Sequence, residues 1–168
     1  MIWIGIILGG VLLLTAAVYV LGALLPETVE GEAEVFIAKS PEVVWAALTD
    51  PETYPLSAKM CKKVDMIAAE DGMAAWNEDI GSTILVNKVV EIDEPTRLVR
   101  ESRDTVVPVT MHSECTVESG NGGCTVRFKA TTIVKSGTWH VPLFRVMLRL
   151  IPNGGPKAYL KMLAAGLG

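Results

Sequence analysis

The sequence has few of the residues on which metal or nucleophile chemistry usually depends. It contains only three cysteines and two histidines in 168 residues, and neither a Cys-x-x-Cys nor a His-x-x-x-His spacing occurs. Aromatic residues make up 6% of the chain, the net charge is −4, and no basic tract is interleaved with aromatics. We therefore expect no metal site, no cofactor and no nucleic-acid partner.

The one close pair of potential ligands is His112 and Cys115. Residues three apart on a strand point to opposite faces, so this pair is not expected to act together. Cys115 and Cys124 are expected on one inner face but far apart along a hairpin, so no disulfide is expected. An odd number of widely spaced cysteines suits a reducing compartment.

Charge is absent from the start of the chain, where Ile2–Leu25 is uniformly uncharged. As a helix rising about 1.5 Å per residue, this run crosses the hydrocarbon core of a bilayer. It lacks the basic start and shorter apolar core of a signal peptide, and only Ala16–Ala17 leaves cleavage open. We expect a single-pass anchor over 1–25, a linker over 26–31 and one domain over 32–168. Basic residues beyond the anchor favour the cytoplasmic side: Lys39, Lys59, Lys62 and Lys63.

The segment Val35–Pro55 begins as an extended apolar run and then takes on helical periodicity. Ser40 suits an N-cap, and Pro41 suits the first helical position, where its missing N–H is harmless. A second short helix is expected to end before Pro55. Three residues of the first helix fall on one apolar face: Val44, Trp45 and Leu48.

Turn signals divide the next part of the chain into six strands with short connections. The strongest hairpin signal, at residues 119–123, predicts a register in which Val117 faces Val126 and Cys115 faces Phe128. The inner face of this hairpin is then Met111, Ser113, Cys115, Val117, Val126, Phe128, Ala130 and Thr132. The strands are expected at residues 60–67, 74–80, 83–92, 98–103, 111–118 and 124–135.

In the strand at 83–92, alternation predicts one apolar face made of Ile84, Val86, Val90 and Ile92. The candidates for acid–base chemistry across the sheet are Glu78, Lys88, Arg100, Glu101, His112 and Glu114. His112 and Glu114 are expected to face outward, which leaves Glu78, Lys88 and Arg100 as inward polar groups. No nucleophile–base pairing is visible, so no catalytic residue is assigned.

Helical periodicity returns from Pro142 to Ile151, and the prolines and glycines of Pro152–Pro156 are expected to break the helix before Lys157–Leu167. Basic residues fall at helical spacing on either side of the break: Arg145, Arg149, Lys157 and Lys161. Two interpretations remain open, a solvated basic face and attraction to anionic lipid headgroups.

Two of these segments resemble a known family. An extended run followed by Ser-Pro-Glu-Val-Val-Trp and Leu-Thr-Asp-Pro-Glu-Thr-Tyr-Pro is similar to the opening of the START-like, Bet v 1-like (SRPBCC) superfamily, which includes polyketide cyclase/dehydrase and lipid-transfer domains. The Pro-Leu-Phe-Arg helix start and the final Ala-Tyr-Leu-Lys-Met-Leu-Ala-Ala-Gly-Leu-Gly resemble the last helix of its polyketide-cyclase-type members. The resemblance covers residues 32–168 and transfers no catalytic residue.

The resemblance implies an α+β helix-grip fold, in which a curved antiparallel sheet of about seven strands wraps around a C-terminal helix. The leading functional hypothesis is membrane-tethered binding or transfer of a hydrophobic small molecule, such as a lipid or quinone, with membrane lipids as partners. The alternatives are a cyclase- or dehydratase-like enzyme and an interaction domain with a collapsed pocket. No oligomeric state is indicated. The expected cavity-lining residues are Trp45, Trp76, Arg100, Met111, Cys115 and Phe128.

Overall fold

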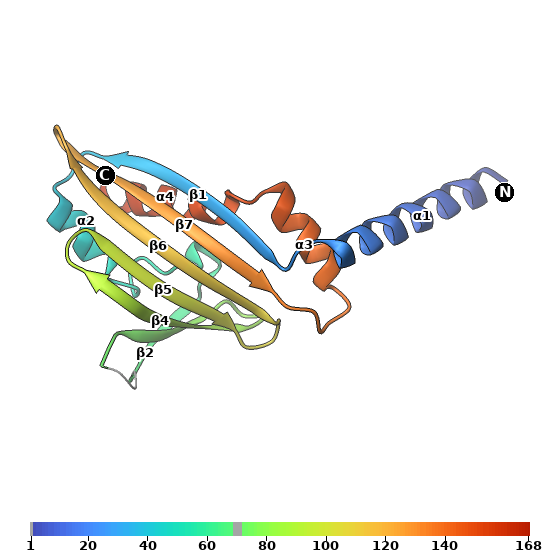
Figure 1. The fold of residues 1–168 in the computed structure, drawn as a ribbon, viewed down its shortest axis with the longest axis horizontal. Coiled ribbons are helices and arrows are strands. Elements are labelled where there is room, and N and C mark those ends of the chain that lie inside the picture. The colour runs from blue at the N-terminus through green and yellow to red at the C-terminus, as the bar shows by residue number, and fades with distance from the viewer. Residues whose placement is uncertain (1, 69–71) are drawn as a thin grey trace.

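The structure is a computed structural model that describes residues 2–68 and 72–168. Helix α1 (Ile2–Leu24) projects from one end of a curved sheet, and helices α3 (Val141–Leu150) and α4 (Gly154–Leu167) follow the last strand (Figure 1). Helix α4 runs beneath the sheet and contacts β1 (Thr28–Ile37) and β7 (Gly123–Val134). The layers are therefore one sheet and one covering helix, with α1 outside them.

The sheet has seven antiparallel strands in the order β1-β7-β6-β5-β4-β3-β2. From β2 to β7 the chain is a meander, and β1 pairs with the last strand. The predicted α+β helix-grip fold is confirmed. The remaining strands are β2 (Lys63–Ile67), β3 (Ala75–Asp79), β4 (Ile84–Asp93), β5 (Arg97–Asp104) and β6 (Val109–Gly120).

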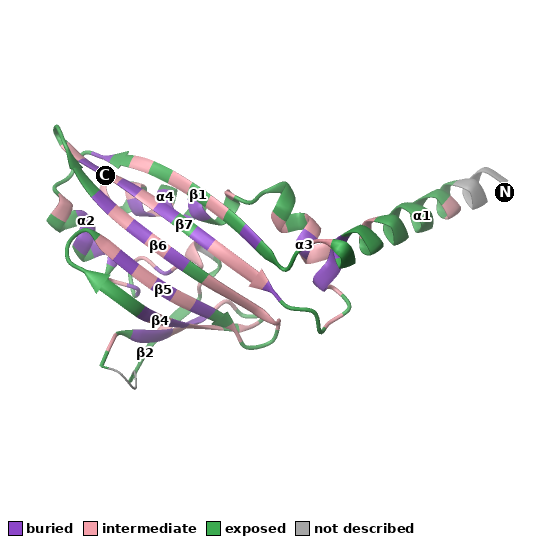
Figure 2. Cartoon of the chain, in the orientation of Figure 1, coloured by how far each residue is buried: buried purple, intermediate pink, exposed green. Residues whose placement is uncertain are grey.

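The predicted β6–β7 hairpin register is confirmed, because Val117 pairs with Val126 and Cys115 pairs with Phe128. Residues of the predicted inner face are buried or half-buried, and Figure 2 shows the buried positions alternating along these strands. The turn needs Gly122 at a φ of 80°, a left-handed conformation that glycine adopts without strain.

The inward face of β4 differs from the face that alternation predicts. Asn87 and Val89 are buried, and the register shifts between Val89 and Glu91. A bulge adds one residue, so a period of two cannot hold along the whole strand. Asn87 is tolerated inside because its side chain accepts a hydrogen bond from Ser102 and donates one to the Leu85 carbonyl at 3.1 Å. Of the predicted residues, Ile84, Val86 and Val90 are exposed or half-buried. Beyond the bulge, Ile92 pairs with the buried Leu98 and does face the inner side.

The helical corner forms as predicted in α2 (Pro41–Leu48), although Ser40 makes no side-chain capping bond. The second short helix expected before Pro55 is absent from this described segment. Its place is taken by a turn in which the Asp50 carboxylate accepts hydrogen bonds from the next backbone amides, at 3.1 and 3.2 Å. A 3-10 turn, η1 (Ala58–Met60), follows.

The predicted break in the C-terminal helix is confirmed, since α3 and α4 are separate helices. The break is docked on β1: the Asn153 side chain accepts a hydrogen bond from the Glu32 amide at 3.0 Å. A Cβ at Gly31 would collide with the Pro152 carbonyl, so only glycine permits this approach. Strand β1 begins at Thr28, which leaves a shorter connection to α1 than the predicted linker of residues 26–31.

Candidate functional site

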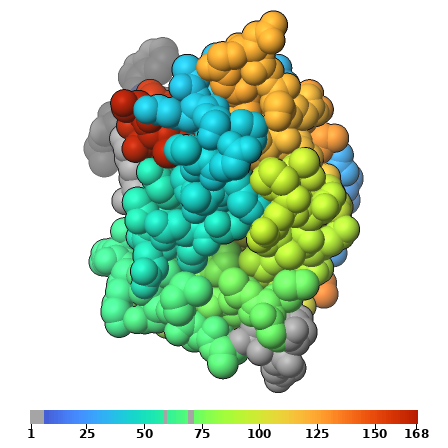
Figure 3. Space-filling model, turned by 90° about the vertical axis from the view of Figure 1, so that its left-hand side faces the viewer, coloured from blue at the N-terminus to red at the C-terminus, as the bar shows by residue number. Residues whose placement is uncertain are grey.

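A partly open cavity of about 220 Å³ lies between α2 and the inner faces of β3, β4 and β5. It is at the end of the sheet opposite α1, as Figures 1 and 3 show, where α2 and the segment after it adjoin the β4–β5 turn. Its walls are mostly apolar, and its lining residues are Leu48, Thr49, Pro51, Gly72, Met73, Ala74, Trp76, Val89, Ile92, Glu94, Leu98 and Arg100.

A larger hollow of about 540 Å³ lies along the outer edge of β1 and β7. It is lined mainly by charged side chains, among them Glu32, Glu34, Arg127 and Lys129, and the Arg127 guanidinium pairs with Glu34 at 3.3 Å. Small-molecule sites are usually concave and mostly apolar, with a few polar groups. The smaller cavity meets that description and the larger hollow does not.

Arg100 is the main polar group of the cavity and is only 1% exposed. Its guanidinium donates to the Leu48 carbonyl at 3.5 Å, to the Cys115 sulfur at 3.3 Å and to the Tyr159 hydroxyl at 3.4 Å. The two distances to oxygen are longer than the usual range of about 2.7–3.2 Å, whereas the distance to the larger sulfur atom is ordinary. The Arg100 Nε–H has no hydrogen-bond partner among the described residues.

The neighbours of Arg100 do not supply an opposite charge. Burial by itself lowers the pKa of the Arg100 guanidinium, but interactions with Tyr159 and Cys115 outweigh it and raise that pKa, so the group stays charged. Burial raises the pKa of the Tyr159 phenol and of the Cys115 thiol, so both are neutral at physiological pH. The Tyr159 ring adds a cation–π contact, with the guanidinium carbon 5.3 Å from the ring centroid.

Glu78 is the other fully buried charged residue near the cavity, and its carboxylate is already satisfied. It accepts hydrogen bonds from the Leu56 amide at 2.9 Å, the Ser57 amide at 2.7 Å and the Trp76 indole at 2.8 Å. Three donors suffice to hold a buried carboxylate. Glu78 therefore fixes the segment after α2 against β3 and positions Trp76 in the cavity wall.

Of the residues expected to line the cavity, Trp76 and Arg100 do so. Trp45, Cys115 and Phe128 lie in the packed core, and Met111 packs against it. The space expected beside Cys115 and Phe128 is filled by Tyr159 from α4, whose ring centroid is 5.1 Å from that of Phe128.

Tyr159 was not predicted near the cavity, although a helical stripe of Tyr159, Leu160 and Leu163 is visible in the sequence. The predicted inward direction is correct for Glu78 and Arg100 and wrong for Lys88. Lys88 is half-buried and points to the opposite face from the buried Asn87, because successive strand residues alternate. Figure 2 shows this banding across the sheet.

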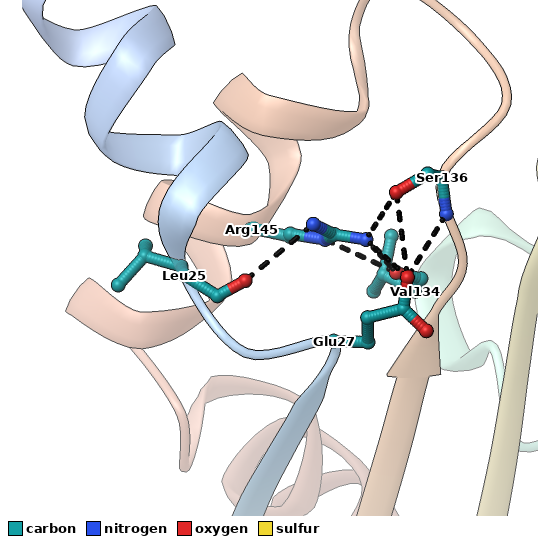
Figure 4. Close-up of polar contacts among 5 residues, drawn as sticks. All are labelled: Leu25, Glu27, Val134, Ser136 and Arg145. Carbon is teal, nitrogen blue, oxygen red and sulfur yellow. Dashed lines mark hydrogen bonds and ion pairs between the residues drawn. The ribbon is translucent and has the colours of Figure 1, made fainter.

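The basic residues of the C-terminal helices do not form one solvated face. Arg145 is 3% exposed and is held by the end of α1 and by β7 (Figure 4). Its guanidinium donates to the Val134 carbonyl at 2.7 and 3.1 Å, to Glu27 at 2.9 Å, to Ser136 at 3.1 Å and to the Leu25 carbonyl at 3.4 Å. The helical spacing of the basic residues is as predicted, but several hydrogen-bond partners of Arg145 lie far from it in the sequence. Three of the four predicted residues are exposed: Arg149, Lys157 and Lys161.

One of the described helices, α1, is long and apolar enough to cross a membrane, and only 6% of its Ile7–Leu24 window is buried. A signal sequence near the N-terminus would meet the same criteria of length and composition. The helix is therefore a candidate span by these criteria alone.

Comparison with solved structures shows several similar folds. An aromatase/cyclase from Streptomyces sp. R1128 superposes with a TM-score of 0.69 at 14% identity, covering 83% of this chain and 93% of that one. A START superfamily protein from Mycobacterium smegmatis gives 0.60 at 14% identity, covering 83% and 97%. The di-domain aromatase/cyclase StfQ of the steffimycin pathway gives 0.63 at 12% identity and covers 82% of this chain, which spans only 50% of StfQ.

At these identities the structural similarity establishes the fold alone. No curated protein matches the sequence. The family described as polyketide cyclase/dehydrase and lipid transport, however, matches residues 28–165, which is most of the chain and includes every described strand, α3 and all but the last two residues of α4. The protein is therefore a member of the polyketide cyclase/dehydrase and lipid-transport family, with the START-like fold.

Proposed function

We propose that the protein binds a small hydrophobic molecule with an acidic end in the cavity beside Arg100, and that α1 anchors the domain to a membrane. Family membership supports binding of hydrophobic ligands in general terms. The observation that carries the specific proposal is Arg100, a buried cation at the wall of an apolar cavity with no anionic partner among the described residues.

The energetics of Arg100 favour an anionic ligand group. Moving a charged side chain out of water costs several kcal/mol even after relaxation. The hydrogen bonds of Arg100 to oxygen are long, and a desolvated cation–π contact returns about 2 kcal/mol. A carboxylate in the cavity would supply the opposite charge that Arg100 lacks, and guanidinium groups bind carboxylates through charge-assisted hydrogen bonds.

The cavity volume limits the ligand to a small molecule. At about 30 Å³ for each water-sized group, 220 Å³ holds about seven such groups. This volume is below the roughly 300–1,000 Å³ of drug-sized pockets. A short-chain acid fits, whereas a long-chain lipid would place only one end inside. Apolar burial worth about 25 cal/mol per Å² supplies the remaining affinity.

The unfilled cavity beside Arg100 favours ligand binding over an interaction domain with a collapsed pocket. The enzyme alternative has no comparable support, because the charged residues of the cavity lining are Arg100 and Glu94 and the latter is exposed on the β4–β5 turn. Membrane lipids were expected as partners because a short tether would hold the domain close to the bilayer. The cavity lies instead at the end remote from α1 (Figure 1), which favours exchange of ligand through the aqueous phase.

Retention of α1 as an anchor is supported by its packing on the domain. Arg145 binds the carbonyl of Leu25, directly after α1, and a Cβ at Gly22 would collide with the Pro142 backbone. A signal peptide that is cleaved off would not need such close contacts with the folded domain. The anchor is a proposal that fractionation of the full chain with membranes tests directly.

Binding is tested by titrating the full chain in lipid nanodiscs with hexanoate and with hexanol, with protein-free nanodiscs as the blank. We expect saturable heat with hexanoate and much weaker binding of hexanol, because only the acid completes the Arg100 contacts. Ala74→Trp places a large ring at the exposed rim of the cavity and should abolish the hexanoate signal. Equal binding to wild type and Ala74→Trp would refute the cavity as the site.

A further inference from the structure

Helix α3 lies across the C-terminal end of α1 (Figure 1), and the two helices pack directly together. The approach is close because Gly22 of α1 faces the backbone of Pro142, where any side chain at position 22 would collide. The connection from α1 to β1 is also short, so α3 is held at the level where α1 leaves the domain.

The two arginines of α3 define the side that faces the sheet. Arg145 binds the Val134 carbonyl at the end of β7, and Arg149 donates to the Thr28 carbonyl at the start of β1 at 3.1 Å. Both belong to one side of the helix, since residues four apart lie on the same face. The opposite side of α3 must point away from the domain.

That opposite side is apolar. Leu143, Met147, Leu150 and Ile151 follow helical spacing of three and four residues, and the last three are exposed. Leu150 is 76% exposed. In the loop before α3, Trp139 is 75% exposed, and its ring meets only His140 among the ring contacts of the described chain, at 5.7 Å.

We propose that this apolar stripe and Trp139 lie in the headgroup–acyl boundary of the bilayer that α1 spans, so that α3 is an interfacial membrane helix. The inference rests on the proposed anchoring by α1. Continuity selects the bilayer as the occupant: the helix that carries the stripe packs directly on α1, whose own surface is apolar and exposed. Interfacial helices characteristically combine an apolar face, basic residues and tryptophan.

The interfacial helix has a consequence for the binding site. Arg145 fixes α3, the end of α1 and β7 to one another (Figure 4), so the domain cannot swing freely on its anchor. With α3 flat on the bilayer, the sheet stands away from the membrane and the cavity at its far end opens toward the aqueous phase. The contacts between α1 and α3 thus set the orientation of the domain relative to the bilayer.

The test uses an environment-sensitive NBD label on single cysteines in the full chain, reconstituted in bilayers containing doxyl-labelled lipids. The background is Cys61→Ser, since Cys115 and Cys124 are 0% exposed and unreactive. The label is placed at Leu150→Cys on α3, at Leu13→Cys on α1, and at Asn121→Cys on the exposed tip of the β6–β7 hairpin. All three sites are exposed, so labelling leaves the fold intact.

At Leu150 we expect strong quenching that is greater with a shallow doxyl position than with a deep one, because an interfacial helix buries only about 5–10 Å into the bilayer. At Leu13 the deep quencher should be more effective, and at Asn121 neither should act. Quenching at Leu13 without quenching at Leu150 would overturn the interfacial helix while leaving the anchor. No quenching at Leu13 would overturn the anchor and this inference with it, whereas hexanoate binding would be unaffected.

Discussion

Replacing Arg145 with methionine is expected to lower the free energy of unfolding by about 2–4 kcal/mol. Hydrogen bonds that involve a charged group contribute about 1.5–3 kcal/mol, and buried acceptors left unpaired add a desolvation cost. Arg145 satisfies the carbonyls of Val134 and Leu25 and pairs with Glu27. The Glu27 side chain is 48% exposed and can return to water, so the ion pair itself adds little to this loss.

Thermal unfolding of the full chain in nanodiscs, followed by tryptophan fluorescence, measures this loss as a fall in midpoint of roughly 10 °C. The matched control is Arg149→Met, on the same helix, which removes one exposed hydrogen bond to Thr28 and should change the midpoint little. Similar midpoints for both variants would show that the Arg145 contacts do not hold the junction.

Replacing Arg100 with methionine is expected to weaken hexanoate binding by about 10–150-fold while leaving the thermal midpoint unchanged or higher. The affinity falls because a charge-assisted contact worth about 1.5–3 kcal/mol is lost. The stability does not fall, since methionine fills similar volume and removes a desolvated cation that lacks an anionic partner. A residue needed only for packing would show the reverse pattern.

The comparison for Arg100 is Arg103→Met, three residues along β5, whose side chain is 67% exposed and pairs with Glu101 on the outer face. Titration calorimetry should show wild-type hexanoate affinity for this variant. Loss of stability in Arg100→Met with unchanged hexanoate affinity would mean that Arg100 serves the fold and not the ligand.

The parts of the fold that depend on neighbours in sequence were predictable. The β6–β7 register follows from a glycine-rich turn with alternating residues on both sides, and both signals are local. The helix break follows from the prolines and glycines of residues 152–156. The inward face of β4 was not predictable by alternation, because the bulge after Val89 shifts the inward–outward alternation of side chains. In addition, the hydrogen bond from Ser102 allows the polar Asn87 side chain to be buried.

The candidate site depends on contacts between distant segments, which periodicity does not reveal. Arg100 was identified as inward from its strand, but its neighbour Tyr159 is 59 residues away on α4 and fills the space expected near Cys115. The regular helical spacing of Arg145 from the other basic residues predicts a surface position for it. Its ion-pair partner, Glu27, is 118 residues away.

Native mass spectrometry of the wild-type full chain, extracted gently from its own membranes, tests the central claim most directly. We predict a bound small hydrophobic acid, seen as an adduct on the polypeptide mass that is lost in Ala74→Trp and much reduced in Arg100→Met. The adduct should persist in Arg103→Met. A wild-type protein that carries no small molecule and takes up none when incubated with hexanoate, or an adduct that survives in Ala74→Trp, would contradict the account.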